Sequence, residues 1–165
     1  MNQQLIECVP NFSEGRDLGI IKQITNEIES VEGVKLLDVD PGAATNRTVV
    51  TFVGTPQAVV DAAFKAIVKA GELIDMSKHS GEHARMGATD VCPFIPVANI
   101  TMEETAKWAT TLAQKVGEST TIPVYLYGES QPNKNRNVLS IIRAGEYEGF
   151  LEKIKKPEWK PDFGP

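Results

Sequence analysis

Residues 48–74 read Thr48-Val-Val-Thr-Phe-Val-Gly-Thr-Pro-Gln-Ala-Val-Val-Asp-Ala-Ala-Phe-Lys-Ala-Ile-Val-Lys-Ala-Gly-Glu-Leu-Ile74. The first part, up to Val53, is rich in β-branched residues and is typical of a strand. Thr55 suits the N-cap and Pro56 the first turn of a helix, so this stretch predicts a strand that passes directly into a helix. Apolar residues then keep helical spacing to about Ile74: Val59, Val60, Ala63, Phe64, Ile67 and Ala70.

The segments before this stretch predict a strand over residues 5–10, a helix over 17–30 and a strand over 34–40. Those after it predict a strand over 90–97, a helix over 101–116 and a strand over 123–127. Pro93 and Pro96 remove ladder donors, so strand 90–97 should be an edge strand or an interrupted one.

The resulting order is β-α-β-β-α-β followed by α-β, and its first six elements match the split, ferredoxin-like β-α-β motif. We therefore predict an α+β fold with an added α-β unit, a mixed sheet, and helices mainly on one face. Residues 1–128 should form the α/β core. Residues 129–165 should be a loop, short helices near 138–144 and 146–155, and an extended tail.

The composition fits one globular domain: 165 residues, of which 41% are hydrophobic and 24% charged. A formal net charge of −5 argues against nucleic-acid binding. No apolar run reaches the roughly 20 residues that span a bilayer, and no signal peptide is visible, so we expect a cytoplasmic protein. Cys8 and Cys92, the two cysteines, should be buried free thiols.

The polar stretch Asp75-Met-Ser-Lys-His-Ser-Gly-Glu-His-Ala-Arg-Met-Gly-Ala-Thr-Asp90 contains both histidines of the chain. His83 is the first candidate for an acid/base, because histidine exchanges protons near neutral pH. Arg85 could hold an anionic substrate. A solvated surface histidine is the plain alternative. The spacing of His79 and His83 also allows a metal site, although no third ligand is evident and we expect none.

Other candidates lie at the ends of the predicted strands. Asp40 is the last residue of a predicted strand and precedes Pro41-Gly42, so it suits either a ligand site or a simple turn. Arg47, in the next loop, could bind a carboxylate or be a solvated charge. Asn11 to Arg16 follow the first strand and could offer backbone N–H groups and Arg16 to an anion. Arg143 sits in a polar stretch and could face a site.

Many uncommon stretches, in order along essentially the whole chain, resemble the N-terminal half of the glutamate formimidoyltransferase (formiminotransferase) family. They include Glu7-Cys-Val-Pro-Asn-Phe-Ser-Glu-Gly15, Leu36-Leu-Asp-Val-Asp40, Gly81-Glu-His83, Asp90-Val-Cys-Pro-Phe-Ile-Pro96, Arg143-Ala-Gly-Glu-Tyr147 and Pro161-Asp-Phe-Gly-Pro165.

The resemblance implies transfer of a formimino group from N-formimino-L-glutamate to tetrahydrofolate, a co-substrate, during histidine degradation. It places the catalytic histidine at His83, the site aspartate at Asp40, and the start of the folate-contacting stretch at Gly164 and Pro165. By residue type, Arg16, Arg47, Arg85 and Arg143 become expected carboxylate anchors, and Asn11 joins the substrate-binding set.

The resemblance also implies a second subdomain, with the active site in the groove between the two, and residues 129–165 should lead toward it. The face that it would cover should favour self-association, so we expect a homo-oligomer. Three alternatives stay open at this point. These are a glutamate formyltransferase, a non-catalytic folate-binding or interaction subdomain that needs a second chain, and a metal-dependent hydrolase built on His79, Glu82 and His83.

Overall fold

The computed structural model describes residues 3–80 and 86–165, and its centre is a single antiparallel sheet. The strands are β1 (Leu5–Cys8), β2 (Asn11–Phe12), β3 (Val34–Gly42), β4 (Arg47–Gly54), β5 (Thr89–Val91) and β6 (Phe94–Ala98). One edge of β4 pairs with β3, and the other pairs first with β2 and then with β1. In turn β2 pairs with β5, and β1 with β6. The sheet is therefore arranged as four long strands. Two of them are interrupted, one into β1 and β2 and the other into β5 and β6.

Proline causes both breaks, because it has no N–H to donate to a ladder. Pro10 separates β1 from β2, and Pro93 lies between β5 and β6. Pairing nevertheless continues across the gaps: the amide of Val9 donates to the carbonyl of Pro93 (3.2 Å), and that of Val50 donates to the carbonyl of Pro10 (3.0 Å). The predicted interrupted strand at 90–97 is confirmed.

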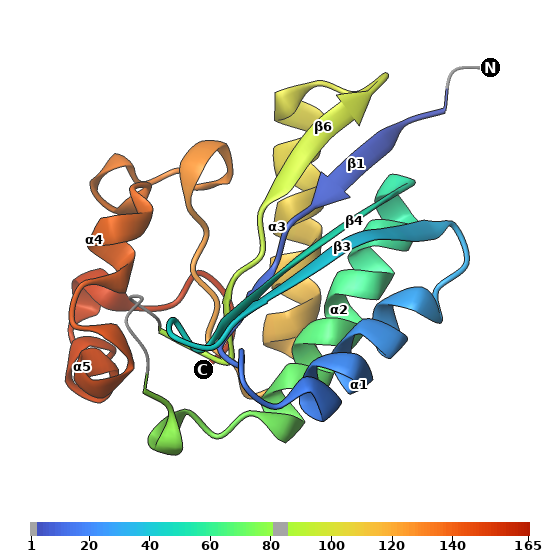
Figure 1. Ribbon diagram of the computed structural model, residues 1–165. Coiled ribbons are helices and arrows are strands. Elements are labelled where there is room, and N and C mark those ends of the chain that lie inside the picture. The colour runs from blue at the N-terminus through green and yellow to red at the C-terminus, as the bar shows by residue number, and fades with distance from the viewer. Residues whose placement is uncertain (1–2, 81–85) are drawn as a thin grey trace.

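Three helices cover one face of the sheet: α1 (Leu18–Glu29), α2 (Pro56–Leu73) and α3 (Met102–Ser119) (Figure 1). Their starts match the sequence, because Asp17 caps α1 and the capping box of Thr101 and Glu104 opens α3. Strand β4 alternates in burial, and its Val50 and Phe52 point into the core between sheet and helices.

The α+β class, the ferredoxin-like order and the one-sided helix layer are confirmed, but two details are corrected. Every strand pair among the described residues is antiparallel, so the sheet is not mixed. The physical reason is that two strands joined through a helix are parallel but not adjacent here. A third strand lies between them and runs antiparallel to both. The second correction concerns residues 123–127, which do not add a strand to the sheet. Val124 makes only an isolated bridge with Phe163 of the tail.

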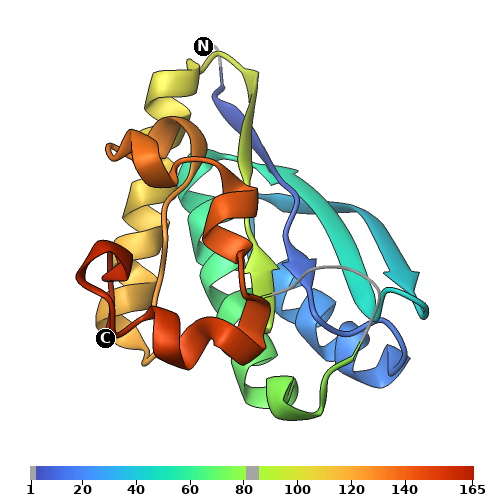
Figure 2. The ribbon, with the colours of Figure 1, turned by 90° about the vertical axis from the view of Figure 1, so that its left-hand side faces the viewer.

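The C-terminal part packs beside α2 and α3, as Figure 2 shows for its two short helices, α4 (Leu139–Arg143) and α5 (Glu146–Lys153). Both agree with the predicted short helices. Arg136, which is buried, pairs with Asp162 (2.8 Å) and so ties the loop after residue 128 to the tail. Within the part of the chain that the structure describes, no helix has the length and apolarity to cross a membrane.

Candidate active site

Three loops meet at the end of the sheet where β2 finishes and β4 begins, and Asn46 holds them together. Its side chain is buried, its φ is +50°, and asparagine tolerates this left-handed conformation better than most residues. Its Oδ1 accepts from the amide of Gly15 (2.9 Å), and its Nδ2 donates to the carbonyl of Ser80 (3.0 Å). Its backbone oxygen lies 2.8 Å from Nε2 of His79.

Gly15 occupies a position that has no room for a side chain. A Cβ there would lie 2.1 Å from the carbonyl oxygen of Gly42 and 2.6 Å from the amide nitrogen of Arg47, both of which are backbone atoms. This close approach lets the loop after β2 rest against the β3–β4 hairpin. Arg16 then reaches over that hairpin, where its Nε donates to the carbonyl of Ala43 (2.9 Å).

The histidine-containing loop, residues 79–88, is anchored on both sides of residues 81–85. Before them, Ser80 is held by Asn46. After them, the hydroxyl of Ser13 donates to the carbonyl of Gly87 (2.7 Å), and the amide of Ser13 donates to the carbonyl of Ala88 (2.8 Å). The candidates His83 and Arg85 lie outside the described residues, so the structure places only the two flanks between which they occur.

Asp75, at the start of the polar stretch that contains both histidines, is engaged in a local turn. Its Oδ1 accepts from the amide (3.0 Å) and the hydroxyl (2.5 Å) of Ser77, and these hydrogen bonds lower the pKa of the Asp75 carboxyl. Asp75 thereby starts the short 3-10 turn Met76–Lys78, which leads directly into His79.

The structure brings three of the predicted residues together on the helix-free face of the sheet. Asp40 of β3 and Asn11 of β2 are both register partners of Val49, so they flank it from opposite sides. Arg47 lies two residues before Val49 and therefore points to the same face. Asp40 is exposed, whereas Asn11 is buried and donates to the carbonyl of Val9 (3.1 Å). A carboxylate, an amide and a guanidinium thus share one end of an open face.

Arg143 is occupied elsewhere. It forms an ion pair with Oδ2 of Asp90, whose side chain has no exposed surface, and Oδ1 of Asp90 accepts from the amide of Met86 (2.7 Å). Arg143 therefore braces the segment that follows residues 81–85 instead of standing on the open face. Gly164 and Pro165 are also apart from this end: the amide of Gly164 would lie 2.7 Å from a Cβ on Gly117, in the last turns of α3.

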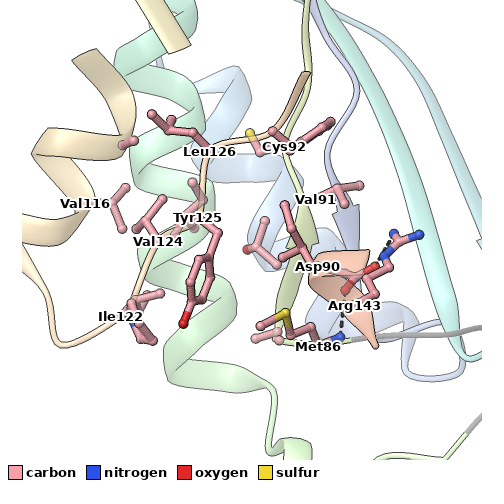
Figure 3. Close-up of a pocket in the computed structure, with 18 of the residues that line it drawn as sticks. Met86, Asp90, Val91, Cys92, Val116, Ile122, Val124, Tyr125, Leu126 and Arg143 are labelled. Carbon is pink, nitrogen blue, oxygen red and sulfur yellow. Dashed lines mark hydrogen bonds and ion pairs between the residues drawn. The ribbon is translucent and has the colours of Figure 1, made fainter. Parts of the chain in front are cut away.

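A cavity of about 350 Å³ opens between β5, the ends of α2 and α3, the extended segment 122–127, and α4 and α5 (Figure 3). Apolar side chains such as Met86, Val116 and Ile122 form most of its wall, and the Asp90–Arg143 pair closes one end. Burial raises the pKa of Tyr127, which also lines it. The sequence does not predict this cavity. Its only signal is the apolar run at 123–127, for which the sequence predicts a strand.

Two buried atoms near this end, Oγ1 of Thr89 and Nε of Arg143, have no hydrogen-bond partner among the residues that the structure describes. No group of three or more histidine, cysteine, aspartate or glutamate side chains that could hold a metal gathers within residues 3–80 and 86–165. Glu82 and His83, which the metal alternative requires, lie outside those ranges.

Comparison with known proteins places this geometry in a family. Residues 5–165 match the family described as "Formiminotransferase domain, N-terminal subdomain". The chain is 57% identical over 162 residues to a formimidoyltransferase-cyclodeaminase of Gallus gallus, a match that covers 98% of this chain and 30% of the relative. Identity is 49% over 163 residues to a glutamate formimidoyltransferase of Thermoplasma acidophilum and 42% over 161 residues to one of Streptococcus pyogenes.

Each of these two glutamate formimidoyltransferases is matched over 98% of this chain and 54% of its own length. The chain therefore spans about half the length of the shorter relatives and under a third of the longer ones. From this near-complete match it follows that the chain belongs to the formiminotransferase family, as an N-terminal subdomain.

Proposed function

We propose that this chain is the first half of a glutamate formimidoyltransferase that acts in histidine degradation in the cytoplasm. The reaction moves the formimino group of N-formimino-L-glutamate to tetrahydrofolate and yields 5-formiminotetrahydrofolate and L-glutamate. The observation that carries the proposal is the match, over 98% of the chain, to proteins named for this activity, at 49% and 42% identity.

The reaction sets the chemistry that the site must supply. N5 of the folate attacks the amidine carbon, which gives a tetrahedral intermediate. N5 must then lose a proton and the glutamate nitrogen must gain one before it leaves. We assign both transfers to His83, and general acid–base catalysis of this kind contributes on the order of 10²–10⁴ in rate. The anchored flanks at Ser80 and Gly87 support this assignment, since they tie the histidine-containing loop to the sheet end.

The open-face residues supply the charges that the substrates need. A formimino group is an amidine, which is cationic when protonated, and the exposed carboxylate of Asp40 is suited to hold it. Glutamate and the folate tail carry carboxylates, which we assign to Arg16, Arg47 and Arg85, with Asn11 as a polar contact. Gly164 and Pro165 begin the proposed folate-contacting stretch. Arg143 acts in this proposal by holding Asp90.

A companion subdomain completes the site. The helix-free face of the sheet carries Asp40 and Arg47 at one end and exposed apolar side chains farther along, with Ile95 41% and Val97 51% exposed. Exposed apolar side chains beside polar ones are typical of a surface that another domain covers. The relatives have the additional length for such a domain, since this chain accounts for 54% of the shorter ones.

That same length difference favours one alternative, a folate-binding or interaction subdomain that turns nothing over by itself. The test is a transfer assay with tetrahydrofolate and either formiminoglutamate or formylglutamate, run with the chain alone and with the chain mixed with a separately produced second subdomain. Mass spectrometry of the folate product identifies the transferred group.

We expect the mixture to make 5-formiminotetrahydrofolate from formiminoglutamate. Folate binding without any turnover in the mixture would favour the non-catalytic alternative. Transfer from formylglutamate only would make the protein a formyltransferase. If the mixture shows no folate binding and no turnover, the proposal is wrong.

A further inference from the structure

The two cysteines of the chain lie 84 positions apart in sequence, but their sulfur atoms are 3.5 Å apart. Cys8 belongs to β1 and is completely buried. Cys92 lies in the break between β5 and β6 and is partly exposed. Its side chain lines the 350 Å³ cavity, as Figure 3 shows. Both thiols are free. No step of the proposed transfer reaction uses either of them.

The geometry brings the two sulfurs close to bonding distance. A disulfide needs them about 2.05 Å apart, so the pair must close by about 1.5 Å. Cys8 is held by its register partners Phe52 and Phe94 on both neighbouring strands. Cys92 is outside either strand, beside Pro93, so no ladder fixes it. Rotation and a small shift of Cys92 can therefore supply the movement while β1 stays in place.

Access is also asymmetric. A small neutral oxidant in the cavity meets Cys92 first, because Cys8 has no exposed surface. Burial raises the pKa of the Cys8 thiol, and the neighbouring Cys92 raises it further. A thiol with a raised pKa is a poor first nucleophile. It can still act second, on a sulfur that is already in contact with it.

We propose that Cys8 and Cys92 form a site of reversible oxidation, in which a two-electron oxidant of the peroxide or azodicarboxamide class converts the pair into an internal disulfide. With diamide, the Cys92 sulfur adds to one nitrogen of the N=N bond, and the other nitrogen takes up a proton. The Cys8 sulfur then attacks the Cys92 sulfur and displaces the hydrazine, which takes the second proton. The two sulfurs are oxidised and diamide is reduced to its hydrazine, so hydrogens and electrons balance.

The disulfide would fasten β1 to the break between β5 and β6, two residues after Asp90. Asp90 holds both the amide of Met86 and Arg143. The oxidised form therefore staples the sheet at the segment that leads out of the histidine-containing loop. A thiol reductant returns the pair to its present state.

The experiment treats the folded chain with diamide and measures its intact mass, its free thiols after denaturation, and its non-reduced proteolytic peptides. We expect a monomer that has lost two hydrogens and both free thiols, and a cross-linked peptide pair that contains Cys8 and Cys92. Dithiothreitol should restore both thiols.

The substitutions Cys92→Ala and Cys8→Ala test the order of reaction. In Cys92→Ala, the buried Cys8 should stay unmodified. In Cys8→Ala, Cys92 should stop at the mixed adduct with diamide. The wild-type peptide map decides the question even if a variant fails to fold. Two free thiols after treatment, or a disulfide only between two chains, would overturn the proposal.

Discussion

Single residues at the end of the sheet decide whether the candidate site can assemble. Asn46 contributes both ends of its amide to different loops, and Gly15 lets two backbones approach until no Cβ fits between them. Neither residue performs chemistry in the proposed mechanism. Both place the segments that do, so substitutions here should reduce stability and activity together.

Gly15→Ala should lower the free energy of unfolding by about 3 kcal/mol, the upper end of the range for overpacking, because backbone atoms at 2.1 Å and 2.6 Å cannot yield cheaply. Gly149→Ala is the matched control. Gly149 lies inside α5 with nothing within 4 Å of an added Cβ, so alanine there should add about 0.5–1 kcal/mol of stability. Urea unfolding of the two variants checks both values, and equal effects would contradict the close approach at Gly15.

Asp90→Asn tests the ion pair between Asp90 and Arg143, which holds the segment that follows the histidine-containing loop. It leaves the guanidinium of Arg143 buried without its counter-charge, which should cost about 3 kcal/mol or more. Glu152→Gln is the control, because the pair of Glu152 with Lys155 is exposed and should matter little. Thermal or urea unfolding reports the difference. A stable Asp90→Asn variant would mean that Arg143 finds another partner.

At the scale of elements, local signals predicted the helices well. Asp17 begins α1 through hydrogen bonds from the amides of Gly19 and Ile20, and the Thr101–Glu104 box opens α3. These signals work because a cap is a contact between residues two or three apart. Pro93 also predicted the break in its strand, because the missing N–H is a property of the proline residue itself.

Signals that depend on distant partners failed. The apolar run from Pro123 to Tyr127 looks like a strand, but its side chains line a cavity and Val124 pairs with Phe163 of the tail. The sequence does not predict the role of Asn46, because that role depends on Gly15 and Ser80, each more than 30 positions away. The sequence does not predict the contact between Cys8 and Cys92 either, because the two residues are 84 positions apart.

The capping box also predicts a pH dependence. Hydrogen bonds from Thr101, first of all from its backbone amide, lower the pKa of the Glu104 carboxyl below its ordinary value. A carboxyl with a lowered folded-state pKa adds stability above its unfolded-state pKa and loses it as pH falls through the folded one. The stability of wild type relative to Glu104→Gln should therefore be constant from neutral pH to about pH 5 and shrink below the unfolded pKa of about 4.3. Urea unfolding from pH 7 to pH 3 measures it, and a pH-independent difference would contradict the assignment.

At the scale of the whole molecule, one face of the sheet is packed and the other is open. Helices α1, α2 and α3 form one layer (Figure 1). The exposed side chains of Ile95 and Val97 in β6 lie on the other side of the sheet. A second subdomain, or a second copy of this chain in its absence, would bury these side chains. The fold thus presents an open face of the sheet, with Asp40 and Arg47 at one end of it.

Val97→Asp should weaken association at this face, because it buries a charge wherever a partner covers β6. Leu151→Asp is the control: Leu151 is 74% exposed, on α5. Sedimentation velocity over a range of concentrations should show wild type and Leu151→Asp self-associating and Val97→Asp monomeric. Wild type that stays monomeric at high concentration would contradict association through the open face.

The most direct test of the central claim is formimino transfer from formiminoglutamate to tetrahydrofolate, followed at the folate chromophore, for wild type and His83→Ala with the second subdomain present. Lys78→Ala, an exposed position before the same loop, is the control. Transfer that is lost in His83→Ala, by a factor on the order of 10²–10⁴, and retained in Lys78→Ala is the predicted result. Equal transfer in all three proteins would contradict the claim that His83 carries the proton transfers.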